Sequence, residues 1–123
     1  MNPSLTTKEV KAFVPAKDFE LSKRFYEALG FTCIWSGPDL AYFNHGQGSA
    51  FLLQNYHVEA CTANFMMHLE VENVDAWWLH ASEVAKQFGV RADPPKDQPW
   101  GMRDFPLVDP SGVLWRVGQP IND

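Results

Sequence analysis

The stretch that decides the fold reads Gln98-Pro99-Trp100-Gly101-Met102-Arg103-Asp104-Phe105 and then Asp109-Pro110-Ser111-Gly112-Val113-Leu114-Trp115-Arg116. It predicts two strands joined by a tight turn, because Asp bonds nearby backbone, Pro fixes φ and Gly permits positive φ. Alternation in the second strand sends Val113, Trp115 and Val117 to one face, which we assign to the core. Arg116 then points away from the core, either into solvent or into the space that the sheet encloses.

The sequence before this stretch predicts a strand and a helix. Apolar residues alternate with polar ones through Phe65, Met67, Leu69 and Val71, which is the cleanest strand pattern in the chain. Asn73 is a suitable helix N-cap, and Gly89 stands where a glycine ends a helix. A short strand is weakly indicated at 90–92, and a proline-rich loop follows at 93–99.

The first half of the chain has the same order of elements. A strand is predicted at 10–14, a helix between the cap Asp18 and Gly30, and three short strands at 31–35, 41–45 and 50–54. Leu29-Gly30-Phe31 is echoed by Phe88-Gly89-Val90. Each half therefore reads β-α-β-β-β, and residues 55–64 form a polar linker. Two such units, each too small to bury its own sheet face, should pair their sheets.

Composition limits the possible functions. A chain of 123 residues with 46% hydrophobic residues predicts one folded domain. The net charge of −5 and the lack of a basic run argue against nucleic acid or anionic membrane as partners, and favour cationic ligands. Cys33 and Cys61 are too few for a disulfide framework, and we find no secretory signal or membrane span, so we expect a cytoplasmic location.

These motifs together resemble the vicinal oxygen chelate superfamily, which contains glyoxalase I, extradiol dioxygenases, fosfomycin-resistance enzymes and bleomycin resistance proteins. The resemblance covers nearly the whole chain. It rests on Asp18-x-x-x-Ser22-x-x-Phe25-Tyr26-x-x-x-Leu29-Gly30-Phe31, on His68-Leu69-Glu70-Val71-Glu72-Asn73-Val74-Asp75, and on Pro99-Trp100-Gly101 through Asp109-Pro110-Ser111-Gly112.

The resemblance implies an α+β fold in which two βαβββ modules form an incomplete barrel around a cleft. Residues 1–123 would be a single domain, with module one at about 8–55 and module two at about 64–119. Members of this superfamily are commonly dimers, so a homodimer is expected.

The superfamily's enzymes hold a divalent metal with His, Gln or Glu on inward-facing strand positions. Those positions fall here on Lys11, Met66 and Arg116, and the fourth falls on Leu52 or Leu53, whose register the sequence does not decide. Lysine and arginine are cationic and methionine is a soft, weak donor, so this set is unsuited to a hard or borderline divalent ion. We therefore expect no metal and no cofactor.

Among members of the superfamily, a chain without metal ligands is similar to the bleomycin resistance proteins. These are small, metal-free dimers that sequester a drug at the dimer interface without changing it chemically. The Gln-Pro-Trp-Gly segment at 98–101 is shared with them, although Pro-Trp-Gly also occurs in metal-dependent relatives. The expected ligand-binding residues are Trp35, Phe43, Met66, His68, Trp100, Met102, Arg103 and Arg116.

Several of these residues have a second interpretation. Trp100 and Trp35 either stack on a planar ligand or fill the core. His68 faces the cavity with Met66, but no other histidine shares a ligand spacing with it, so hydrogen bonding is favoured over metal binding. Lys11, Arg103 and Arg116 either form internal ion pairs, with Glu70 or another carboxylate, or grip an anionic group of a ligand.

The sequence thus predicts a metal-free, homodimeric protein that binds an aromatic, antibiotic-like small molecule in a preformed cleft. The alternatives are a metal-dependent lyase or dioxygenase, and a protein–protein module without a small ligand.

Overall fold

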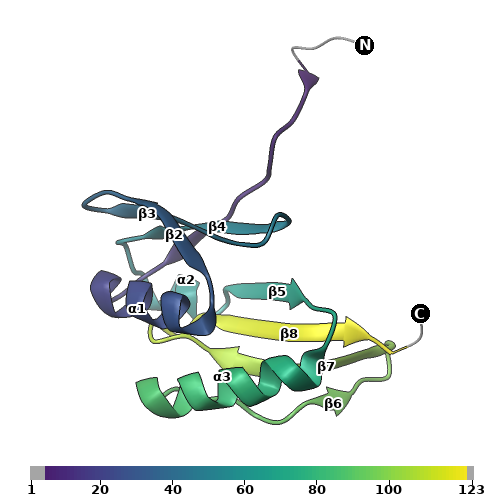
Figure 1. Cartoon of the computed structure of the whole chain (residues 1–123). Helices are drawn as coiled ribbons and strands as arrows, with labels where there is room; N and C mark the ends of the chain where they lie inside the picture. The colour runs from purple at the N-terminus through teal and green to yellow at the C-terminus, as the bar shows by residue number, and fades with distance from the viewer. Residues whose placement is uncertain (1–4, 122–123) are drawn as a thin grey trace.

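The computed structural model describes residues 5–121, in two consecutive βαβββ modules (Figure 1). The first module contains β1 (Phe13–Pro15), α1 (Phe19–Leu29), β2 (Thr32–Ser36), β3 (Leu40–His45) and β4 (Ser49–Gln54). The second contains β5 (Met66–Glu70), α3 (Val74–Phe88), β6 (Lys96–Asp97), β7 (Met102–Val108) and β8 (Leu114–Pro120). A one-turn helix, α2 (Glu59–Thr62), lies in the linker. The predicted repeat is confirmed.

Each module builds one open, four-stranded sheet. The strand orders are β1-β4-β3-β2 and β5-β8-β7-β6, so the first strand of each module pairs in parallel with its last strand. The two registers are equivalent. Phe13 pairs with Leu52 and lies five residues before the cap Asp18, and His68 pairs with Arg116 and lies five residues before the cap Asn73. The two sheets do not close into a barrel within the chain.

The helices α1 and α3 begin and end where the sequence predicts. Asp18 Oδ1 accepts a hydrogen bond from Leu21 N, and Asn73 Oδ1 accepts one from Ala76 N. Gly30 and Gly89 end the helices in the left-handed region, at φ 118° and 65°. None of the helices among residues 5–121 is long and apolar enough to cross a membrane.

Two predicted strands differ in the structure. The first strand begins at Phe13 rather than Val10, whose side chain is 97% exposed. The segment before β1 extends away from the body of the molecule, where it has no strand beside it (Figure 1). The strand predicted at 90–92 is reduced to a single bridge between Ala92 and Leu107, and the short strand forms later, at Lys96–Asp97.

The core is one continuous cluster rich in aromatic rings. Phe51 contacts the rings of Tyr26, Phe31, Phe43 and Trp115, so side chains of both modules meet there. Trp115 is buried, as predicted. Trp77 and Trp78 are both half-buried, and they contact His45 and Phe105 respectively.

A buried hydrogen-bond network joins the two modules. The Tyr26 hydroxyl of α1 donates to Asp109 Oδ2 and accepts from Trp115 Nε1 at 2.9 Å. Asp109 Oδ1 accepts from the backbone N of Ser111 at 2.8 Å and of Val113 at 2.9 Å. The Asp-Pro-Ser-Gly segment is therefore both a turn and the contact that holds module two against α1.

Candidate ligand-binding site

The register of the second sheet leaves one face uncovered by α3. Leu69, Phe105 and Val117 point to the core, so their neighbours along each strand point the other way. We call this uncovered face the second open face. Its side chains are those of Met66, His68, Glu70, Met102, Asp104, Pro106, Leu114 and Arg116. Met66, His68, Met102 and Arg116 were all predicted to line a ligand site, and the structure brings them to this one face.

The first sheet has a corresponding face, which we call the first open face. Phe13, Leu52 and Tyr42 lie side by side across β1, β4 and β3. A bulge between Cys33 and Trp35 shifts the register of β2, so that Trp35 pairs with Tyr42 and shares this face. Phe13 is 53% exposed and Trp35 is 54% exposed. The first open face is thus aromatic and accessible in the single chain.

Arg116 forms an ion pair on the second open face. Its Nη1 lies 3.3 Å from Asp104 Oδ1, and Gln98 Nε2 donates to the same oxygen at 3.0 Å. Asp104 is buried because Gly118 lies opposite it, and a Cβ at Gly118 would fall 2.9 Å from Asp104 Cβ. Asp104, rather than Glu70, is therefore the internal carboxylate. The Arg116 side chain remains one-third exposed beside a depression of ≈ 190 Å³.

His68 lies at the edge of a second cavity. This cavity has a volume of ≈ 420 Å³ and runs between the start of β4 and the strand β5. Its lining combines polar groups, His68, Glu70 and Ser49, with the rings of Phe51 and Trp115. No hydrogen bond to the imidazole is present among the described residues, so both ring nitrogens are available to a ligand.

Lys11 also has an internal partner. Its Nζ lies 2.6 Å from Glu9 Oε1 and 5.1 Å from the centre of the Tyr42 ring, and the Tyr42 hydroxyl donates to the same oxygen. Hydrogen bonds from Lys11 and, to a lesser extent, from Tyr42 lower the pKa of Glu9. This cluster attaches the extended segment before β1 to the first open face.

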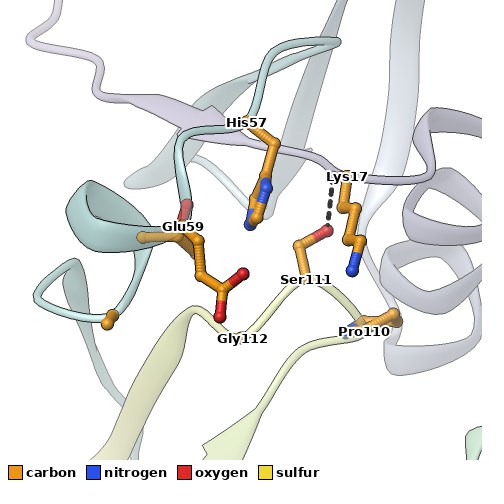
Figure 2. A pocket seen from close by; sticks show the side chains of 8 residues that line it. Lys17, His57, Glu59, Pro110, Ser111 and Gly112 are labelled. Atoms are coloured by element: carbon orange, nitrogen blue, oxygen red, sulfur yellow. Dashed lines mark hydrogen bonds between the residues drawn. The ribbon is translucent and has the colours of Figure 1, made fainter.

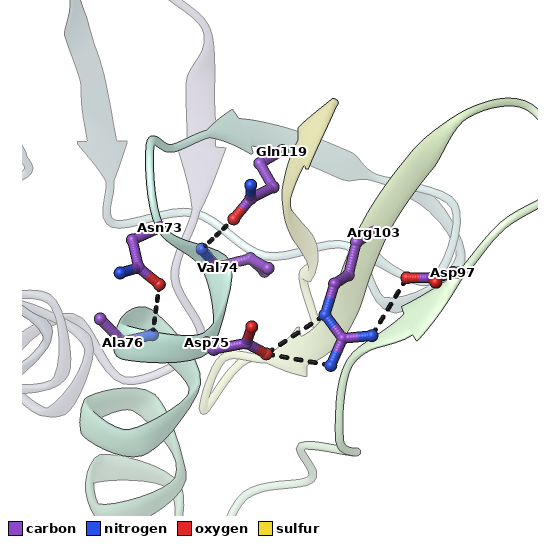
Figure 3. A network of polar contacts seen from close by, with 7 residues as sticks. All are labelled: Asn73, Val74, Asp75, Ala76, Asp97, Arg103 and Gln119. Atoms are coloured by element: carbon purple, nitrogen blue, oxygen red, sulfur yellow. Dashed lines mark hydrogen bonds and ion pairs between the residues drawn. The ribbon is translucent and has the colours of Figure 1, made fainter. Parts of the chain in front are cut away.

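Two of the predicted site residues lie elsewhere. Arg103 is on the opposite face of β7, where its guanidinium donates to Asp75 at the start of α3 and to Asp97 (Figure 3). Phe43 has no exposed surface and stacks on Phe51 in the core. The alternation of side chains along each strand could have predicted both positions. Arg103 shares a strand face with the core residue Phe105, and Phe43 shares one with the core residue Ala41.

Trp100 is 65% exposed in the turn before β7. The turn is held by Gln98 N donating to Met102 O at 2.7 Å and by Gly101 at φ +88°. The ring therefore projects from an ordered loop and does not cap the core. Trp100 belongs to the loop of the second sheet and Trp35 to the edge of the first, so one chain carries them on different sheets.

The residues at the positions that hold metal in related enzymes are unsuited to a metal ion. Leu53 is fully buried, whereas Leu52 lies on the first open face at the register position equivalent to Arg116. The set is therefore Lys11, Leu52, Met66 and Arg116, with two of its members already in ion pairs. Ammonium, guanidinium and hydrocarbon groups provide no ligands for a divalent ion, and the single Met66 thioether is a soft, weak donor, so these residues do not fit a metal. Within residues 5–121, no three His, Cys, Asp or Glu side chains cluster into a possible metal site.

The fold and the two open faces define the class of protein. It is built from two βαβββ modules and has an accessible aromatic and polar surface. Across residues 10–117 the chain matches the Glyoxalase/Bleomycin resistance protein/Dioxygenase superfamily, and it belongs to that superfamily. No curated protein matches the chain by sequence.

Solved structures of several relatives share the fold. A bleomycin-binding protein complexed with bleomycin is 24% identical with a TM-score of 0.78, over 92% of this chain and 98% of that one. TnmS3, an antibiotic-binding protein from Streptomyces sp. CB03234, is 26% identical with a TM-score of 0.73, over 94% and 98%. A lactoylglutathione lyase from Agrobacterium tumefaciens is 17% identical with a TM-score of 0.68, over 93% and 95%.

Proposed function

We propose that this protein is a homodimer that reversibly binds an aromatic, antibiotic-like small molecule and sequesters it without chemical change. The observation that carries the proposal is the pair of open faces. They expose Phe13, Trp35 and Met66 to solvent in the single chain, and exposed apolar surface of this kind typically marks a binding site. The similarity to two antibiotic-binding proteins supports the same function.

The charges on the second open face favour a ligand with a cationic group. Arg116 already has the partner Asp104, whereas Glu70 is exposed and makes no ion pair among residues 5–121. The overall net charge of −5 acts in the same direction. In our proposal Trp35 and Trp100 stack on planar groups of the ligand, and Met66, Met102 and His68 contact its edges. The two free cysteines agree with a cytoplasmic location.

Binding should be visible in tryptophan fluorescence. We expect bleomycin, tested within a panel of aromatic antibiotics, to quench the emission saturably. Trp100→Ala or Trp35→Ala should weaken binding about tenfold or more, because a lost stacking ring costs about 1–3 kcal/mol. Tyr56→Ala, which removes an exposed ring in the linker, is the matched control and should bind normally. If Trp100→Ala leaves quenching and affinity unchanged, Trp100 is structural and this site is wrong.

The fold of the lactoylglutathione lyase keeps a metal-dependent enzyme as the alternative. Elemental analysis of the protein after incubation with Zn²⁺, Ni²⁺, Mn²⁺ or Fe²⁺ and dialysis discriminates between the two functions. Stoichiometric metal retained through dialysis would favour the enzyme. The side chains of Lys11, Leu52, Met66 and Arg116 argue against that outcome.

The proposed dimer explains how residues of the two sheets reach one ligand. Each open face lacks a cover in the single chain, and a second copy placed across them buries apolar surface on both. Light scattering at micromolar concentration should give twice the 14.0 kDa mass of one chain. Phe13→Glu places a charge on the first open face and should shift the mass toward the monomer, whereas Leu79→Glu, on the exposed side of α3, should not. A wild-type monomer under these conditions would contradict a cleft between subunits.

A further inference from the structure

Asp104 is a buried carboxylate on a face of the sheet that is otherwise open. Its side chain is 3% exposed and lies beside Gly118 of the neighbouring strand, which has no side chain. Charged side chains are almost never fully buried unless they are paired. Lys17 and Glu59, which form no ion pair within residues 5–121, are both exposed at the junction of the two modules (Figure 2). The groups that pair with Asp104 therefore indicate what its burial achieves.

One oxygen of Asp104 binds side chains from two other segments. Gln98 Nε2 donates to Asp104 Oδ1 at 3.0 Å from the segment after β6, and Arg116 Nη1 donates to it at 3.3 Å from β8. Because β7 lies between β6 and β8 in the sheet, Asp104 joins both neighbours of its own strand. Hydrogen bonds that involve a charged group are among the stronger ones in proteins.

Gln98 is the first residue of the turn that carries Trp100. Its backbone N donates to Met102 O at 2.7 Å, and Gly101 N donates to Gln98 O at 3.1 Å, so the turn closes on Gln98. The Trp100 ring itself is 65% exposed. Its orientation therefore depends on the backbone of this turn, and the side chain of Gln98 ties the start of the turn to Asp104.

Two consecutive residues of β7 hold two consecutive residues before Trp100. On one face of the sheet Arg103 donates to Asp97 at 3.0 Å (Figure 3), and on the other face Asp104 accepts from Gln98. The Asp97 side chain is 63% exposed, and exposed ion pairs contribute little to stability. A hydrogen bond to a buried charged group is stronger, so Asp104 makes the larger contribution.

We propose that Asp104 is a positioning residue of the ligand site. It holds the turn at 98–101 so that Trp100 is fixed before a ligand arrives, and it orients Arg116 on the second open face. Because it is buried, it acts through these two residues and not by touching the ligand. Fixing a stacking ring in advance lowers the entropy that binding costs. The role in binding rests on the proposed function, whereas the order of the turn is a property of the free protein.

Amide hydrogen exchange of the free, isotope-labelled protein, followed by NMR, tests the order of the turn. In Gln98→Ala and in Asp104→Ala the amide of Gly101 should exchange about tenfold faster, because a hydrogen bond to a charged group is lost. Gln98→Ala leaves the ion pair of Asp104 in place, so a loss of folding does not explain its effect. Asp104→Asn keeps an oxygen that accepts from Gln98 and should restore slower exchange.

Lys96→Met is the matched control for this measurement. Lys96 lies opposite Asp104 on β6 and forms no ion pair within residues 5–121, so its loss should leave the exchange at Gly101 unchanged. Wild-type exchange at Gly101 in both Gln98→Ala and Asp104→Ala would overturn the proposal.

A double-mutant cycle with bleomycin, read by the same fluorescence titration, tests whether the contact acts through Trp100. Gln98→Ala should weaken binding about threefold or more, because the ring must then be ordered by the ligand. Added to Trp100→Ala it should cause no further loss, since the turn no longer carries a ring to position. Losses that simply add would contradict the positioning role. If bleomycin and the other antibiotics do not bind the wild type while exchange at Gly101 responds as expected, the proposed function fails and the positioning of the turn stands.

Discussion

Replacing Asp109 with alanine should lower the free energy of unfolding by about 3 kcal/mol or more, because it leaves three buried donors without an acceptor at about 1–3 kcal/mol each. The donors are the Tyr26 hydroxyl and the backbone amides of Ser111 and Val113. Since total stability is typically about 5–15 kcal/mol, this change removes a large part of it. Urea unfolding followed by circular dichroism measures the loss.

Asp109→Asn is the matched control for this substitution. Its carbonyl oxygen can keep the two backbone amides, and its NH₂ group can donate to the Tyr26 oxygen, so it should retain more stability than Asp109→Ala. An alanine variant as stable as the wild type would show that the turn, and not the network, holds the modules together.

The wild type and Asp109→Asn should differ in how their free energies of unfolding depend on pH. Burial raises the pKa of Asp109 above its ordinary value of 3.8, although hydrogen bonds from Tyr26 and the backbone oppose this. A carboxyl whose pKa is higher in the folded than in the unfolded state contributes stability below 3.8, and that contribution is lost as pH rises through the folded value. The wild type should therefore lose stability relative to Asp109→Asn as pH rises from about 4. A constant difference between the two proteins across this range would contradict the raised pKa.

Leu53→Ala should destabilise the protein by about 2–5 kcal/mol, the usual cost of a cavity in a packed core. Leu53 has no exposed surface and pairs with Ala41 and Val14 on the core face. The adjacent Leu52→Ala is the control, because Leu52 is only half-buried on the first open face and should cost much less. Thermal or urea unfolding of the two variants compares them directly.

This comparison also tests the register of β4. If Leu52→Ala is the more damaging change, the strand is shifted by one residue and every side chain on it changes face. In that case Leu53, rather than Leu52, would stand at the position equivalent to Arg116. If both variants are equally damaging, β4 is buried on both faces and the first open face is covered in solution.

Local signals in the sequence were enough to predict the elements and their order. The caps Asp18 and Asn73, the ending glycines Gly30 and Gly89, and the two-residue alternation of β5 and β8 act within a few residues of one another. For that reason they predicted the repeated βαβββ order, the buried Trp115, the strand face that His68 shares with Met66, and the direction of Arg116 away from the core. The exposed Val10 shows the limit of such patterns, because a strand also needs a partner strand beside it.

Only the tertiary structure decided which distant groups meet. Asp104, and not Glu70, became the partner of Arg116, because Gly118 on the adjacent strand leaves room for it. Arg103 pairs with Asp75 because the start of α3 covers that face of β7. Sequence periodicity therefore determined the face on which each side chain lies, whereas packing of segments far apart in the chain determined its neighbours, since charge pairing depends on distance in space.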